Sequence, residues 1–149
     1  MARTRLRKLW IWSFDEAAFY STKLVGTSLH VCSGRSTVGD VRIDLYEEAT
    51  IKADYRHLPI RDKAFDSVIC DPVWGKSEPI HLGIKNWLFE LIRVARKRII
   101  IIHNTLFSLR WKGHESWDLV EAWAVRSHQG TRYKIMGIHE PQHSLIQGS

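Results

Sequence analysis

Residues Phe65–Trp74, with the sequence FDSVICDPVW, decide the fold. The apolar run from Val68 to Cys70 has the length and composition of a buried central strand, and it ends abruptly in an acid, a proline and an aromatic residue. In open α/β sheets the ligand crevice lies beyond the carboxyl ends of the strands. We therefore predict that the segment from Asp71 to Trp74 projects into a crevice where chemistry takes place.

Three shorter β-rich runs precede this strand, at residues 29–32, 41–44 and 51–53. The second run ends in Asp44, and Asp54 follows the third, as Asp71 follows the central strand. Aspartate is a common turn former after a strand, so any one of these acids is ordinary. Their repetition favours three neighbouring strands that end at one edge of a sheet.

The chain beyond Trp74 alternates again between helix and strand patterns. Apolar residues at helical spacing over residues 84–95 predict a helix with one buried face. The aliphatic run Ile99–Ile102 is typical of a strand in a parallel sheet. Two β-compatible runs, Leu119–Arg126 and Arg132–His139, flank a glycine-containing turn and predict a closing hairpin.

Length and charge bound the class of protein. At 149 residues the chain is long enough for one full core and too short for two, and 44% hydrophobic with 26% charged residues is ordinary globular composition. We divide it into a basic N-terminal arm (1–12), one domain (13–141) and a flexible tail (142–149). A capping box of Ser13 and Glu16 predicts a helix over residues 14–23. The formal net charge of +6 favours an anionic partner such as nucleic acid.

The sequence argues against a metal-binding, secreted or membrane-spanning protein. Cys32 and Cys70 lack the spacing of metal ligands and cannot form a disulfide framework, so we expect no metal site and a cytoplasmic protein. Asp15 and Glu16 interrupt the apolar segment that follows the basic start, which argues against a signal peptide. The longest aliphatic run is far shorter than the roughly twenty residues of a membrane span, so we expect no membrane partner.

The segment from Asp54 to Val68 gives the clearest resemblance to a known family. Asp54 followed by Leu58-Pro59-Ile60-Arg61-Asp62 and then Phe65-Asp66 resembles a sequence block of the class I S-adenosylmethionine-dependent methyltransferases. Asp71-Pro72-Val73-Trp74 is similar to the Asp-Pro-Pro-Trp/Tyr motif of the members that methylate amino groups. The resemblance implies a Rossmann-like three-layer αβα fold of minimal size, with a mostly parallel sheet that ends in an antiparallel hairpin.

The resemblance also implies which residues bind the cofactor, S-adenosyl-L-methionine. The glycine loop after the first strand holds the methionine part, which Ser33 and Gly34 match here, with Cys32 beside them. The acid closing the second strand takes the ribose hydroxyls, as Asp44 would. The acid after the third strand accepts from the adenine amine, as Asp54 would, with Tyr55 next to it. Carboxylates suit both tasks because they accept hydrogen bonds from hydroxyl and amine donors.

The sequence departs from the family in two places. Only one glycine of the Gly-rich loop is present, and the link from Cys32 to Val41 is too short for a full crossover helix, which normally needs a dozen or so residues. Either the first helix is a single turn, or the two strands form an antiparallel hairpin, which would remove most support for the cofactor site. Val73 replaces the second proline of the motif, which removes one fixed φ angle.

The motif residues suit methyl transfer to a weakly nucleophilic amine. The Asp71 carboxylate and the Pro72 backbone carbonyl would accept from the amine hydrogens and aim the nitrogen lone pair at the methyl group. Trp74 would stack on a flipped base, an interaction worth about 1–3 kcal/mol. We expect these three residues to be catalytic.

We accordingly expect a methyltransferase acting on an amino nitrogen, with adenine N6 in DNA or RNA as the first candidate. Guanine N2 in RNA and a glutamine side-chain amide are alternative acceptors, because similar motifs serve them. A third alternative is a catalytically inactive module that binds S-adenosylmethionine or nucleic acid. We expect no separate domain that reads a base sequence, so selectivity would come from the basic arm, the loop from Trp74 to Gly83, a partner or substrate shape. A partner subunit or a homodimer is the expected assembly.

Overall fold

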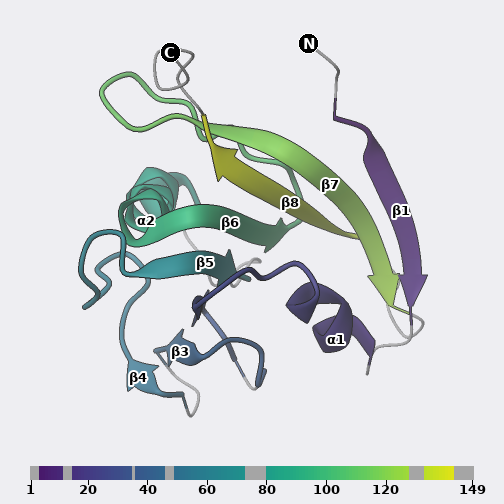
Figure 1. Cartoon of the computed structure of the whole chain (residues 1–149), viewed down its shortest axis with the longest axis horizontal. Helices are drawn as coiled ribbons and strands as arrows, with labels where there is room; N and C mark the ends of the chain where they lie inside the picture. The colour runs from purple at the N-terminus through teal and green to yellow at the C-terminus, as the bar shows by residue number, and fades with distance from the viewer. Residues whose placement is uncertain are drawn as a thin grey trace.

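The computed structural model describes residues 4–11, 15–34, 36–45, 49–72, 80–127 and 133–142. Its elements, in chain order, are β1 (Leu6–Ile11), α1 (Glu16–Ser21), β2 (Ser28–Val31), β3 (Val41–Asp44), β4 (Ile51–Lys52), β5 (Phe65–Cys70), α2 (Ile80–Val94), β6 (Ala95–His103), β7 (Trp117–Ser127) and β8 (Lys134–Pro141). The strands form one sheet in the order β1-β7-β8-β6-β5-β2-β3-β4 (Figure 1).

The sheet is mostly parallel, as the sequence predicts. The pairs β2–β3, β3–β4, β2–β5, β5–β6 and β1–β7 are parallel. Among the strands of the described residues, β8 alone runs the other way, between β6 and β7, and it closes the predicted hairpin. The arrowheads of β5, β6 and β7 therefore point to one side of the molecule in Figure 1, while that of β8 points to the other.

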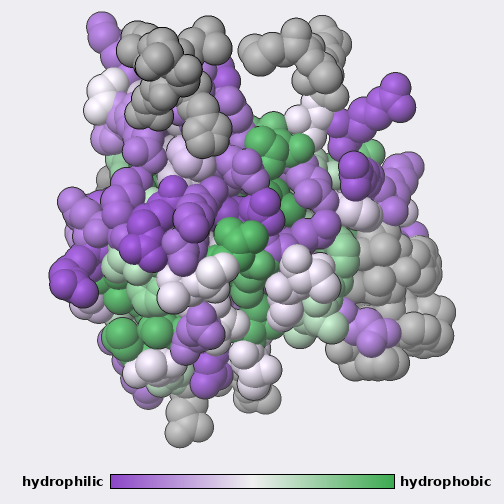
Figure 2. Space-filling model, viewed as in Figure 1, coloured by the Kyte–Doolittle hydropathy of each residue, from purple (hydrophilic) through white to green (hydrophobic). Residues whose placement is uncertain are grey.

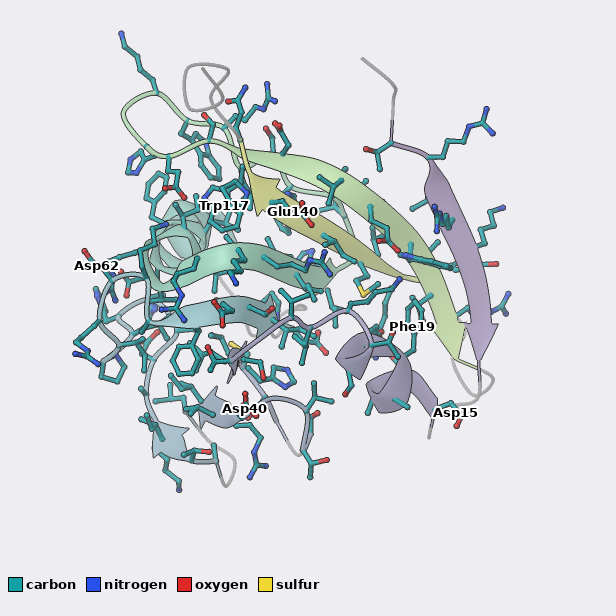
Figure 3. The ribbon with its side chains drawn as sticks, in the orientation of Figure 1. Asp15, Phe19, Asp40, Asp62, Trp117 and Glu140 are labelled. Atoms are coloured by element: carbon teal, nitrogen blue, oxygen red, sulfur yellow. The ribbon has the colours of Figure 1, made fainter. Side chains whose placement is uncertain are left out.

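The two helices pack on opposite faces of the sheet, so the expected three layers are present, although thin. Successive strand residues point to opposite faces. On β6, Ile99 and Ile101 contact the cluster that includes Trp87 and Leu91 of α2. The alternate residues of β6 lie in a second cluster with Tyr20 of α1. Phe19 of α1 also packs edge-on against Trp123 of β7, with ring centroids 5.2 Å apart, and Figure 3 shows it on the side of α1 nearest β7.

The basic segment near the N-terminus supplies a strand that the sequence analysis did not expect. Residues 6–11 form β1, which pairs with β7 in parallel from Leu6–Ala122 to Ile11–Ser127. The segment carries too few alternating apolar residues to show a strand pattern, since Arg5, Arg7 and Lys8 are exposed. Its place at the sheet edge explains this composition, because charged residues suit an edge strand.

Helix α1 is shorter than the sequence predicts. It spans Glu16–Ser21 and follows Asp15, whose side chain makes no capping hydrogen bond. The predicted cap residue Ser13 lies outside the described residues. The Glu16 carboxylate, predicted to turn back toward the cap, instead accepts hydrogen bonds from Tyr20 and Lys134.

The short link between β2 and β3 makes a parallel connection, which excludes the antiparallel hairpin. Leu29 pairs with Val41 and Val31 with Ile43 in parallel register. No helix forms in the described part of residues 32–40. The link is held by hydrogen bonds instead, because the Asp40 N–H donates to Ser28 O at 3.1 Å and the Ser28 N–H donates to Asp40 Oδ2 at 3.0 Å.

Gly39 is required by this link, and its replacement should destabilise the fold. Its φ of 98° is a conformation that L-residues rarely adopt, and an added Cβ would lie 3.1 Å from His30 Cβ and 3.3 Å from His30 N. We expect Gly39→Ala to lower the free energy of unfolding by about 1–3 kcal/mol, measured by urea denaturation. Gly113→Ala is the control, since its added Cβ meets no atom within 4 Å although its φ is also positive. Equal losses in the two variants would contradict the packing argument.

The exposed surface is mainly hydrophilic on the face that can be seen. On the face drawn in Figure 2, hydrophilic residues dominate and hydrophobic residues show in separate patches. Neither helix within the described ranges is long and apolar enough to cross a bilayer.

Candidate active site

The ends of β2 and β3 meet at Ser33, Gly34 and Asp44. Gly34 has a φ of 54°, in the left-handed region that glycine adopts without strain, and Cys32 has a φ of 57°. The Ser33 N–H donates to Ile43 O at 3.0 Å, and the Gly34 N–H donates to Asp44 Oδ2 at 2.8 Å. The loop is thus fastened directly to the acid that closes the second strand. A Cβ built at Gly34 meets no atom within 4 Å, so its outer side is open.

Asp54 and Tyr55 lie one strand further along, after β4, and both have structural contacts. The Asp54 carboxylate accepts from the guanidinium of Arg56, with a shortest distance of 2.6 Å. This hydrogen bond is the main cause that lowers the pKa of Asp54 below its ordinary value. The Tyr55 ring packs against Trp87 of α2, with centroids 5.7 Å apart. A ligand that used Asp54 would therefore share the carboxylate with Arg56.

Asp71 follows β5 at the same edge of the sheet. Its N–H lies 3.4 Å from Val31 O, which continues the β2–β5 pairing to the strand ends. Its side chain is partly buried, as is that of Cys32, while Pro72 is buried. Trp74, the third predicted catalytic residue, lies outside the described residues.

Asp71 and Ser33 line one cavity of about 350 Å³. The cavity brings together side chains from α1, the β2–β3 link, the end of β5 and the hairpin: Glu16, Ala17, Tyr20, His30, Ser33, Ser36, Thr37, Asp71, Ile102 and Lys134. Of the predicted site residues, Ser33 and Asp71 line this cavity. Gly34, Asp44, Asp54 and Tyr55 do not line it, although Asp44 is bonded to Gly34, the residue after Ser33.

Glu16, Tyr20 and Lys134 form a polar group at this cavity that the sequence analysis missed. Glu16 Oε1 accepts from Tyr20 Oη at 2.7 Å and from Lys134 Nζ at 2.7 Å. Burial and the Glu16 carboxylate raise the pKa of Tyr20, so its phenol stays protonated. Glu16 and Lys134 are 118 positions apart in the sequence, and no local pattern signals such a pairing.

His30 lines the cavity and carries a ring nitrogen that can accept a hydrogen bond. Its Nδ1 lies 3.0 Å from Val38 O, and since a carbonyl can only accept, Nδ1 carries the proton. Burial lowers the pKa of His30, so the ring is neutral and Nε2 has a lone pair. Neither His30 Nε2 nor the buried Ser33 Oγ has a hydrogen-bond partner within the described part of the chain. Both atoms are therefore suited to a bound ligand.

The two cysteines lie at the strand ends as free thiols. Burial, followed by a hydrogen bond with Cys32, raises the pKa of Cys70 well above its ordinary value. The Cys70 thiol is therefore protonated and unreactive. No cluster of three His, Cys, Asp or Glu side chains that could hold a metal ion occurs among the described residues.

Solved structures similar to this chain are found, although no protein-family model and no curated protein sequence match it. The PH0226 protein of Pyrococcus horikoshii aligns with a TM-score of 0.59 at 13% identity, over 87% of this chain and 88% of that one. Magnesium protoporphyrin IX methyltransferase from Synechocystis, solved with bound S-adenosylmethionine, aligns with a TM-score of 0.55 at 11% identity, over 85% and 76%. An S-adenosylmethionine-dependent methyltransferase from Thermotoga maritima aligns with a TM-score of 0.54 at 11% identity, over 89% and 90%.

This chain has the class I methyltransferase fold. The predicted fold class is thereby confirmed, including the antiparallel strand that completes the sheet. The β2–β3 link differs from the usual arrangement in that its described residues contain no crossover helix.

The basic residues near the end of α2 form ion pairs. Arg93 pairs with Glu90 and Asp62, and Arg98 pairs with Glu140.

The ionised carboxylate of Asp71 should lower the free energy of unfolding at neutral pH. Burial raises the pKa of Asp71 from 3.8 to about 6; the positive charge of Lys134 opposes this rise, and the Glu16 carboxylate adds to it. Between these two values the folded chain binds more protons than the unfolded chain, so stability falls as pH rises. We expect Asp71→Asn to raise the free energy of unfolding by up to about 3 kcal/mol at pH 8, at 1.36 kcal/mol per pKa unit.

The gain from Asp71→Asn should be much smaller at pH 4 and disappear below about pH 3, where the carboxyl is protonated in both states. Urea denaturation of both proteins at pH 4 and pH 8 measures this difference. A gain of the same size at both pH values would show that ionisation of Asp71 is not its cause.

Proposed function

We propose that this protein is an S-adenosylmethionine-dependent methyltransferase that methylates an amino nitrogen, with adenine N6 of DNA or RNA as the acceptor. One observation carries the proposal: Ser33 and Asp71, which follow β2 and β5, line a single cavity in a class I methyltransferase fold. The loop residue Gly34 is bonded to Asp44 beside this cavity. Enzymes of this architecture place their ligands at this edge of the sheet.

The residues at the cavity fit the cofactor in chemistry. His30 Nε2 and Ser33 Oγ are buried polar atoms without a partner among the described residues, and they would accept or donate hydrogen bonds to its amino-acid part. Asp44 would accept from ribose hydroxyls while it holds the Gly34 N–H. S-adenosylmethionine, when bound, supplies an electrophilic methyl group on a sulfonium.

Asp71 would act on the acceptor amine. Its carboxylate and the Pro72 carbonyl accept hydrogen bonds from the two amine hydrogens, which orients the nitrogen lone pair and stabilises positive charge that develops on nitrogen. This role requires the ionised carboxylate. Trp74 would stack on the base and offset part of the cost of removing it from its neighbours.

The raised pKa of Asp71 gives the reaction an acid limit. With a pKa of about 6, Asp71 is ionised at pH 7 and increasingly protonated below pH 6. We expect kcat/KM for the nucleic-acid substrate to fall about tenfold for each pH unit below that value, measured with S-adenosylmethionine held at a saturating concentration. A flat profile from pH 5 to pH 8 would exclude an ionised Asp71 from the rate-determining complex.

The basic edge strand supports a nucleic-acid acceptor. Arg5, Arg7 and Lys8 are exposed on and beside β1, and Arg7 lies over the Trp123 ring at 5.4 Å. Figure 1 shows that β1 ends on the side of the molecule where α1 lies, and Glu16 of α1 lines the cavity. Cations in this position would hold a phosphate backbone near the cavity, with an affinity that falls as salt rises.

A non-catalytic binding module is the second candidate. It is favoured by the Asp54 carboxylate, which is already engaged by Arg56, and by a loop with a single glycine. Such a module would bind nucleic acid, or S-adenosylmethionine without transferring its methyl group.

The decisive experiment uses methyl-labelled S-adenosylmethionine with DNA, RNA and an unrelated protein offered separately. Digestion to nucleosides and mass analysis should then find N6-methyladenosine or its deoxy form. Label in guanosine, or in protein alone, would refute adenine as the acceptor. Cofactor binding without any transfer would leave the binding module.

A further inference from the structure

A second and larger groove lies away from the cavity at Asp71. It has a volume of about 780 Å³ and shares no lining residue with that cavity. It is formed by the start of β7, the end of β8, the segment that follows β6, and a residue before β1: Thr4, Leu106, Phe107, Ser108, Leu109, Arg110, Trp117, Asp118, Leu119, Val120 and His139. Figure 3 shows Trp117 and Glu140 together at the end of the sheet opposite α1.

Five of the residues that line this groove come from the β7–β8 pair. Leu119 lies opposite His139, and Ala122 opposite Gly137, in antiparallel register. Gly137 has no side chain, so the His139 ring leans over it: a Cβ built at Gly137 would lie 3.2 Å from His139 Nε2 and 3.2 Å from a Leu106 methyl carbon. The glycine thus leaves space that the imidazole and Leu106 occupy.

Two buried polar side chains in this groove lack hydrogen-bond partners. His139 and Trp117 are each 1% exposed. Neither ring nitrogen of His139, nor the indole Nε1 of Trp117, has a partner within the residues the structure describes. Such groups are exceptional in native proteins, because an unpaired donor or acceptor loses its hydrogen bonds to water on burial. Their position in one groove points to a ligand that supplies the missing hydrogen bonds.

The chemistry of the two side chains limits what the ligand can be. Burial lowers the pKa of His139 to about 4, so its imidazole is neutral and offers one donor and one acceptor. The Trp117 indole is a donor only. The other walls combine the apolar side chains of Leu106, Phe107 and Leu109 with an ion pair of Arg110 and Asp118. A ligand that matches them has apolar faces and an edge with acceptors next to a donor.

We propose that this groove binds a nucleobase-like heterocycle through a lactam edge, with His139 and Trp117 as its hydrogen-bonding residues. Leu106 is 40% exposed, and its methyl group occupies the space next to Gly137. It is therefore the side chain that a ligand would displace. The heterocycle could belong to a free nucleoside or to a single-stranded nucleic acid. The inference is independent of the proposed methyl transfer, because binding here requires none of the residues around Asp71.

Uridine is a suitable probe, because it has a lactam edge but no amino group that could accept a methyl group. The experiment is a titration of the full ¹⁵N-labelled chain with uridine and, separately, with a short single-stranded oligouridylate, observed at the Trp117 indole N–H. We expect a saturable shift. A shift with both ligands, or with uridine alone, identifies a nucleoside site, and a shift with the oligomer alone identifies a polymer site.

Two variants locate the binding. His139→Leu should weaken it by about tenfold or more, since it removes both hydrogen-bonding nitrogens. Leu106→Ala, an exposed change that does not threaten the fold, should strengthen binding or leave it unchanged because it uncovers His139. The proposal is overturned if neither ligand shifts the Trp117 signal at millimolar concentration, or if folded His139→Leu binds as the natural chain does. If His139→Leu does not fold, weaker binding by Leu106→Ala overturns it.

Discussion

Asp71→Ala should reduce methyl transfer by about 10²–10³-fold, the usual cost of removing one preorganised group that stabilises developing charge. Affinity for S-adenosylmethionine should change little, because the loop and Asp44 are fastened to each other independently of Asp71. The expected signature is a loss in kcat with a nearly unchanged dissociation constant for the cofactor, measured by single-turnover kinetics and calorimetry.

Asp62→Ala is the matched control for Asp71→Ala. Asp62 is also an aspartate in the block that resembles the methyltransferases, but it is paired with Arg93 on the surface, with 76% of its side chain exposed. Its removal should leave transfer close to that of the natural chain. Equal losses in the two variants, or a loss of cofactor affinity in Asp71→Ala, would contradict the assigned role.

Asp44→Ala should have the opposite effect and weaken cofactor binding first. The change removes the 2.8 Å bond that holds the Gly34 N–H, and hydrogen bonds to charged groups contribute about 1.5–3 kcal/mol. The dissociation constant for S-adenosylmethionine should therefore rise about 10- to 100-fold, measured by calorimetry, while saturating cofactor restores most of the turnover.

Asp54→Ala provides the comparison for Asp44→Ala. Its carboxylate is already engaged by Arg56, so we expect a smaller effect on cofactor affinity. If Asp54→Ala weakens binding more than Asp44→Ala does, the adenine contact outweighs the loop contact, and our ranking of the two acids is wrong.

The strands, and the aspartates at their ends, could be predicted because a strand and the turn that follows it show in the local sequence. The run from Val68 to Cys70 is apolar throughout, as a strand covered on both faces must be, and it lies fully buried in β5. Asp44 is the last residue of β3, and Asp71 is the first residue after β5. Because these strands are parallel, both residues lie at the same edge of the sheet. Ser33, which came from the family resemblance, and Asp71 line one cavity, but Asp44 and Asp54 do not line it, so the regular strand ends alone do not group the three acids.

The β2–β3 link shows where local rules were insufficient. Its length allowed either a single helical turn or a hairpin, and the structure has neither in its described part. The strands it joins are parallel, and hydrogen bonds between Ser28 and Asp40, and between His30 and Val38, hold the link against β2. Such bonds depend on the two strands already lying side by side, which the sequence does not reveal.

Long-range pairs account for what was missed at the site. Glu16 lies in a helix whose predicted cap suggested a local role, yet its carboxylate binds Lys134 from the last strand. Strand β1 was likewise unexpected, since its identity as a strand comes from pairing with β7. Both contacts join the two ends of the chain, so tertiary structure decides them.

The most direct test of the account is the binding of S-adenosylhomocysteine to the ¹⁵N-labelled protein, followed at the backbone amide of Gly34. We predict saturable one-to-one binding that shifts the amide signals of Ser33 and Gly34 and leaves that of Gly137, which lies in the middle of β8 and does not line the cavity, unchanged. Absence of binding at millimolar ligand, or shifts confined to the groove around His139, would contradict a cofactor site at the ends of β2 and β3.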